Sequence, residues 1–129
     1  MLANSIERGI TMTDLTKDAY VVVISSDMMG DGEREIGEKL MTSFTYALSE
    51  QDQFPTHVLF YNSGVHVSAG ESKAREDLVK LQEAGVKIQS CGTCLDYYGY
   101  NKENLPVGEA TNMYEIVRIM RSASRVVKP

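Results

Sequence analysis

The residues best suited to covalent chemistry in this sequence are two cysteines, Cys91 and Cys94, separated by Gly92 and Thr93. The thiolate is the nucleophilic form of cysteine, and the unpaired N–H groups at a helix N-terminus lower the pKa of a thiol placed there. We expect Cys94 at such a helix start, where a fall of about one to two units from the free pKa of about 8.5 would make the thiolate abundant near neutral pH. A thiolate of this kind can accept a sulfane sulfur from a donor persulfide and pass it on.

Other uses of the cysteine pair remain open. Cys91, at the end of the preceding strand, is placed to attack a persulfide on Cys94 or to form a disulfide with it, and either thiol also suits apolar packing. A dithiol redox protein of the thioredoxin-like class would likewise place CxxC in a strand–helix unit. A zinc site needs four ligands, and the nine-residue spacing of His57 and His66 does not fit a zinc finger. Neither a metal site nor a cofactor is predicted.

An α/β fold must position the motif, because apolar strands alternate with amphipathic helices along the chain. Strands are predicted over 20–26, 56–61, 86–90, 105–107 (weakly) and 125–128, and helices over 33–49, about 72–85 and from 112 onward. Right-handed crossovers between such strands give a mostly parallel sheet of about five strands with helices on both faces.

Apolar stripes predict which helix faces lie on the sheet. In the first helix the stripe is Ile36, Leu40, Phe44, Ala47 and Leu48, and in the last helix it is Met113, Ile116, Val117 and Met120. Asn112 is the expected N-cap of the last helix, with Glu115 three residues further on in a box-like pairing.

Three loops are predicted to meet beyond the carboxyl ends of the strands, where sheets of this kind bind ligands. These loops are 27–32, 62–64 and 91–94. Asn62 and Ser63 are placed to donate hydrogen bonds to a terminal persulfide or an incoming substrate, although as turn formers they need no such role. Asp27 and Gly64 lie in the same loops. The residues Tyr97, Tyr98, Tyr100 and Tyr114 cluster near the motif and predict a subunit contact.

Composition and charge narrow the class of protein. The chain has 129 residues, which fits one domain, and we predict an N-terminal tail or arm at 1–18 followed by a single domain at 19–129. The net charge of −5 argues against nucleic-acid binding. No apolar run approaches the length of a membrane span, and no secretory signal is evident, so a cytoplasmic protein is expected.

Several blocks of sequence occur in order between Tyr20 and Lys128. They are Ser26-Asp27 with Met29-Gly30, then Phe60 to Val65 (FYNSGV), then Cys91 to Gly99 (CGTCLDYYG), then Val107-Gly108 with Asn112 to Tyr114 (NMY). Together the blocks resemble the DsrE/DsrF-like sulfur-relay proteins, most closely the C-terminal domain of YedF-like proteins linked to selenium metabolism.

The resemblance implies a three-layer α/β/α fold, homo-oligomers or hetero-oligomers, and a persulfide-carrying cysteine at the start of the helix after the third strand. That cysteine is Cys94 here, with Cys91 assisting. Candidate substrate-binding residues are Asp27, Asn62, Ser63, Gly64 and Asn112. The sequence therefore predicts a sulfur or selenium carrier, or a sulfurtransferase-like protein, working with a separate donor or acceptor such as a TusA-like carrier. An oligomeric binding or scaffold protein with inert cysteines, or a dithiol redox protein, is the alternative.

Overall fold

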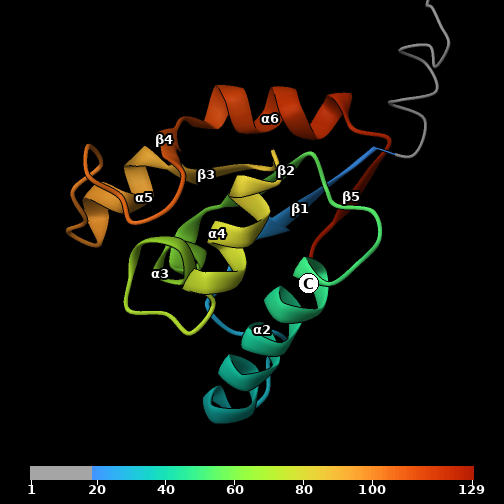
Figure 1. Ribbon diagram of the computed structural model, residues 1–129. Coiled ribbons are helices and arrows are strands. Elements are labelled where there is room, and N and C mark those ends of the chain that lie inside the picture. The colour runs from blue at the N-terminus through green and yellow to red at the C-terminus, as the bar shows by residue number, and fades with distance from the viewer. Residues whose placement is uncertain (1–18) are drawn as a thin grey trace, which may run out of the picture.

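A single sheet of five parallel strands organises the chain in the computed structural model, which describes residues 19–129 (Figure 1). The strands are β1 (Tyr20–Ile24), β2 (His57–Phe60), β3 (Lys87–Cys91), β4 (Glu109–Thr111) and β5 (Arg125–Val127). Their order across the sheet is β4-β3-β2-β1-β5, and every neighbouring pair is parallel. The predicted class of fold, α/β with a parallel sheet of about five strands, is confirmed.

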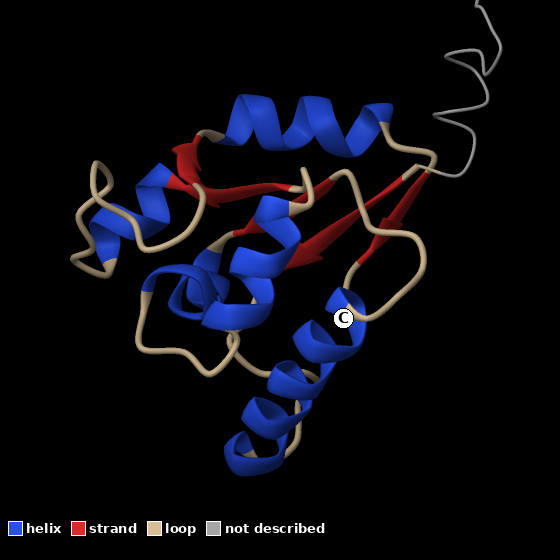
Figure 2. Cartoon of the chain, in the orientation of Figure 1, coloured by secondary structure: helices blue, strands red, loops and turns tan. Residues whose placement is uncertain are grey.

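Helices cover both faces of the sheet, as the three-layer prediction requires (Figure 2). One face carries α2 (Arg34–Ser49), α3 (Val65–Ala69) and α4 (Arg75–Glu83). The other face carries α6 (Met113–Ser122), and the short α5 (Gly92–Tyr97) lies at the end of β3.

The central strands are buried on both faces, which explains why their sequences are continuous apolar runs. In β1, Val22 and Ile24 face the core beneath α2, α3 and α4, while Val21 and Val23 face the core beneath α6. Such strands must be covered twice, and the helices on the two faces provide that cover.

The strand register brings the functional loops to one edge of the sheet. Ile24 pairs with Phe60, and Phe60 pairs with Ser90, so β1, β2 and β3 end at the same level. The loops that follow these three strands therefore begin side by side.

The fourth strand lies later in the chain than the weak strand predicted at 105–107. The structure places β4 at Glu109–Thr111, where Ser90 pairs with Ala110. Pro106 has no N–H to donate to a ladder. Gly108 adopts a φ of 73°, and a Cβ there would lie 2.3 Å from the carbonyl oxygen of Ile88, so this turn packs tightly against β3 and the strand pairing begins at the next residue, Glu109.

The face of α2 that packs on the sheet matches the predicted apolar stripe only in part, because Leu48 is buried and Phe44 packs against the core. Ile36 and Leu40 are 50% and 43% exposed, and Ala47 is also exposed. The buried positions are Gly37, Met41, Thr45, Leu48 and Ser49. The prediction was wrong for Ile36, Leu40 and Ala47, because the helix is rotated so that its glycine meets the loop after β1: a Cβ on Gly37 would lie 2.7 Å from the Cβ of Met28.

The last helix follows its prediction only in part. Ile116 is buried, but Met113 and Val117 are about half exposed, and Ile119 completes the buried face. The predicted N-cap is confirmed, because Asn112 Oδ1 accepts a hydrogen bond from the N–H of Glu115 at 2.9 Å.

Two further expectations concern the chain as a whole. Across residues 19–129, every helix is too short or too polar to cross a bilayer. The arm predicted for residues 1–18 lies outside the described residues.

Candidate functional site

The cysteine motif forms the junction between β3 and α5, as the sequence predicts. Cys91 is the last residue of β3 and is only 3% exposed, whereas Cys94 is the third residue of α5 and is partly exposed. Both are free thiols. Cys94 packs against the apolar clusters on both faces of the sheet. The two thiols thus differ in access to solvent, and Cys94 is the one that a reagent can reach.

A main-chain hydrogen bond joins the thiol to the loop after β2. The N–H of Asn62 donates to Cys94 Sγ at 3.1 Å, across 32 residues of sequence. Asn62 has a φ of 53°, a left-handed conformation that asparagine tolerates better than most residues. Its side-chain oxygen accepts from the N–H of Ser63 at 2.8 Å, so the side chain is bonded to its own turn. The donor to the sulfur is therefore the backbone of Asn62 rather than its amide side chain.

The pKa of Cys94 departs from the prediction. Burial raises the pKa of the Cys94 thiol above its ordinary value, the Asn62 N–H lowers it, and hydrogen bonding and charge interaction with Cys91 raise it again. The expected lowering by the helix start was wrong, because desolvation disfavours the thiolate more than the single donor N–H favours it.

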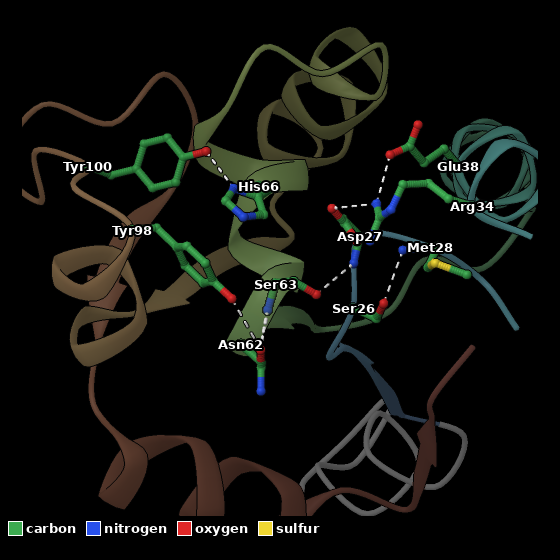
Figure 3. A network of polar contacts seen from close by, with 10 residues as sticks. All are labelled: Ser26, Asp27, Met28, Arg34, Glu38, Asn62, Ser63, His66, Tyr98 and Tyr100. Atoms are coloured by element: carbon green, nitrogen blue, oxygen red, sulfur yellow. Dashed lines mark hydrogen bonds and ion pairs between the residues drawn. The ribbon is translucent and has the colours of Figure 1, made fainter. Parts of the chain in front are cut away.

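The other residues predicted for the loops after β1 and β2 hold those loops together. Ser63 Oγ accepts from the N–H of Asp27 at 3.2 Å (Figure 3). Gly64 is buried, and a Cβ on it would lie 2.0 Å from the carbonyl oxygen of Ile24. Asp27 Oδ2 pairs with Arg34 at 3.1 Å, while its Oδ1 is buried without a hydrogen-bond partner among the described residues. These contacts fix the position of Asn62, which is next to them in the chain.

Asn112 plays a different part from the other candidate residues. Its side-chain oxygen accepts from Glu115 and so is occupied by the N-terminus of α6. The structure gives no contact between Asn112 and the thiols, so its observed role is to start the helix.

Three aromatic side chains that the sequence did not assign to the site form a cluster that reaches Asn62 through Tyr98 (Figure 3). The Tyr98 hydroxyl donates to Asn62 Oδ1 at 3.4 Å. The ring of His66 lies 4.3 Å from that of Tyr98, and His66 Nδ1 is 2.7 Å from the Tyr100 hydroxyl. Tyr97, by contrast, is 82% exposed. No pattern in the sequence distinguishes these tyrosines, because the contacts join segments that are more than thirty residues apart.

A cleft of about 370 Å³ lies next to this cluster, between the start of α2 and the segment that follows α3. Asp27 and His66 form part of its wall, and Cys94 does not. Within residues 19–129, no three His, Cys, Asp or Glu side chains are gathered so that they could hold a metal ion. The chemistry that the site offers is therefore that of a partly buried thiol with one backbone donor.

Known proteins share this architecture. The chain matches YchN from E. coli with a TM-score of 0.66 and 18% identity, covering 87% of this chain and 99% of that one. It matches a protein of unknown function, MTH1491 from Methanobacterium thermoautotrophicum, with a TM-score of 0.60 and 21% identity, covering 87% and 100%. A conserved protein of unknown function, BT1422 from Bacteroides thetaiotaomicron, gives 0.62 and 8%, covering 89% and 98%. These likenesses show the fold.

A comparison of sequences assigns the chain to a family, which the structural likenesses alone do not do. A search of curated proteins finds no match. The model of the DsrE/DsrF-like family, in contrast, matches residues 19–129, which include the cysteine motif and the Asn62 loop that contacts it. The chain therefore belongs to the DsrE/DsrF-like family.

Proposed function

We propose that this protein carries sulfane sulfur, or the corresponding selenium species, as a persulfide on Cys94. The family is associated with sulfur relay in general. The observation that carries the proposal is the hydrogen bond from the Asn62 N–H to Cys94 Sγ, at a position that remains open to solvent. A main-chain donor held against the sulfur stabilises negative charge on the thiolate that attacks and on the thiolate that leaves.

The transfer step needs no external oxidant or reductant. The Cys94 thiol loses its proton to solvent, and the thiolate attacks the outer sulfur of a donor persulfide. A new S–S bond forms at Cys94, the S–S bond of the donor breaks, and the donor leaves as a thiolate that takes up a proton. Because burial raises the pKa of Cys94, the thiolate is the minor form of the free thiol at neutral pH, and the transfer proceeds through that minor form.

Mass spectrometry of the intact protein tests the proposal. After treatment with glutathione persulfide and removal of the reagent, we expect one adduct of about 32 Da, the mass of a sulfur atom, reversed by a phosphine reductant. Cys94→Ser abolishes the adduct, and Cys91→Ser retains it. Absence of the adduct from wild-type protein, or its presence in Cys94→Ser, would contradict the proposal.

A dithiol redox function is the second candidate, because Cys91 lies three residues before Cys94 at the same strand–helix junction and raises the pKa of its thiol. In this function the two thiols close a disulfide, with loss of two protons and two electrons to an oxidant. A protein that forms the disulfide with oxidised glutathione, and carries no persulfide, would have this function. A protein that gives neither product would be a scaffold with inert cysteines.

Partners and assembly belong to the same proposal. A separate carrier, of the TusA-like kind or as in YedF-like proteins, would donate or accept the sulfur in the cytoplasm. Homo-oligomers are proposed as well, since Ile36 and Leu40 on α2 are exposed apolar side chains on one helix face. Light scattering after gel filtration measures the assembly, and Leu40→Glu is expected to dissociate it; a monomeric wild type would disprove it.

A further inference from the structure

The loop that supplies the N–H to Cys94 is held in a closed ring of contacts. The main-chain N–H of Tyr98 donates to the carbonyl oxygen of Cys94 at 3.1 Å, one turn back in the chain. The Tyr98 hydroxyl donates to Asn62 Oδ1 at 3.4 Å, and the Asn62 N–H donates to Cys94 Sγ at 3.1 Å. The thiol is therefore connected to Tyr98 both through α5 and through the Asn62 loop.

The aromatic ring of Tyr98 is supported by His66, which is held in turn by Tyr100. The His66 ring lies against the Tyr98 ring at 4.3 Å with an interplanar angle of 59° (Figure 3). His66 is itself held by Tyr100, whose hydroxyl is 2.7 Å from Nδ1 and whose ring meets the imidazole edge-on at 5.7 Å. His66 belongs to α3, which begins directly after the 3₁₀ turn Asn62–Gly64. Asn62 and His66, the two residues that hold Tyr98, therefore come from one continuous segment.

The conformation that these side chains maintain is a left-handed one. Asn62 adopts a φ of 53°, which asparagine tolerates better than most residues but less freely than glycine, so contacts on its side chain help to hold it. If the contacts on this turn are lost, its backbone is free to change, and the N–H of Asn62 is no longer held against Cys94. The stabilising contacts on its side chain are the bonds from Ser63 and Tyr98.

We propose that Tyr98 and His66 are positioning residues for Cys94, which keep the Asn62 main-chain N–H on the sulfur and so set the reactivity of the thiol. Neither side chain touches the sulfur by this mechanism; both act through Asn62. The proposal deepens the proposed function and rests on Cys94 being the reactive thiol. It does not depend on which group Cys94 carries, so alkylation tests it independently of persulfide transfer.

The measurement is the rate of carboxamidomethylation of Cys94 by iodoacetamide from pH 6 to pH 10, with tandem mass spectrometry to distinguish Cys94 from Cys91. Tyr98→Phe removes only the hydroxyl, and we expect the rate near neutral pH to fall by about two- to threefold, with the pH midpoint moved upward. Tyr97→Phe is the matched control, because it removes the hydroxyl of the adjacent, exposed tyrosine and should leave the profile unchanged.

A double-mutant cycle separates positioning from general loosening. Asn62→Gly keeps access to positive φ but removes the oxygen that Tyr98 contacts, so Tyr98→Phe should have no further effect in that background. His66→Ala should slow alkylation at least as much as Tyr98→Phe, and His66→Phe, which restores a ring against Tyr98, should recover most of the rate. Equal effects of Tyr98→Phe in the two backgrounds, or no effect in either, would overturn the proposal. Circular dichroism confirms that each variant is folded.

Discussion

Gly64 is the position at which the structure makes its sharpest prediction about stability. Its backbone is helical, with φ −59° and ψ −27°, so alanine suits the conformation and the effect of Gly64→Ala is purely steric. The added Cβ would lie 2.0 Å from the carbonyl oxygen of Ile24 and 2.8 Å from its carbon. Both atoms belong to the backbone, so β1 and the turn after β2 must move apart by about 1.4 Å to reach ordinary contact at 3.4 Å.

The magnitude follows from what that separation disrupts. Overpacking in a tight site costs about 1–3 kcal/mol. The movement also strains two bonds between the same segments, from the N–H of Tyr61 to the Ile24 oxygen and from the N–H of Asp27 to Ser63 Oγ, each contributing about 1 kcal/mol. We expect Gly64→Ala to reduce the free energy of unfolding by about 3–5 kcal/mol. A domain of this size has a total of about 5–15 kcal/mol, so the variant should still fold.

Urea unfolding followed by circular dichroism measures this change. Gly32→Ala is the matched control, because its Cβ meets no atom within 4 Å and its φ is not left-handed, so its effect should stay within about 0.5 kcal/mol. The alkylation rate of Cys94 should also fall in Gly64→Ala, since Asn62 is two residues away. A loss below about 1 kcal/mol would refute the reasoning, because it would mean that the ends of β1 and β2 are not in close contact.

Other predictions concern the thiols, the last helix and a buried pair of hydroxyls. Because the pKa of Cys94 is raised by burial and by Cys91, half-maximal alkylation should lie above pH of about 8.5, and stability should decline as the pH rises above that value. Cys91→Ala should move the alkylation midpoint down, and an upward movement would contradict the assigned cause. Asn112→Ala should lower the free energy of unfolding by about 1 kcal/mol without changing the alkylation rate of Cys94. A slower alkylation would show that Asn112 also affects the reactive thiol. Ser68→Ala should lower the free energy of unfolding in urea by about 1–3 kcal/mol, because it leaves the buried Ser90 hydroxyl without its partner at 2.7 Å. Adding Ser90→Ala should recover part of this loss. If the losses from the two single variants simply add in the double variant, the pairing of the two hydroxyls is contradicted.

The backbone framework could be predicted from the sequence, because its signals are local. The strands β1 and Lys87–Cys91 are predicted from the residue types within each segment and in the turns that flank it. Asn112 is recognisable as a cap because Glu115, its bonding partner, is three residues away. In each case the interacting groups lie within one turn or one strand of each other.

The helix faces could not be predicted in the same way. A stripe of apolar residues shows that a helix is amphipathic, but its rotation depends on what lies beneath it. In α2 the contact of Gly37 with Met28 turns Ile36 and Leu40 outward. Gly37 has no side chain and so does not contribute to a hydrophobic pattern, yet its close contact with Met28 determines which face of α2 packs on the sheet.

The sequence alone determined that Cys94 would lie at a strand–helix junction at the carboxyl edge of a parallel sheet. Only the tertiary structure decided the environment of its sulfur. The donor N–H comes from Asn62, the aromatic support comes from His66, and the pKa is raised because the folded chain partly shields the thiol from water. Local sequence carries the dipole of a helix start, but desolvation is a property of everything packed around a group, and so it appears only when the whole chain is folded.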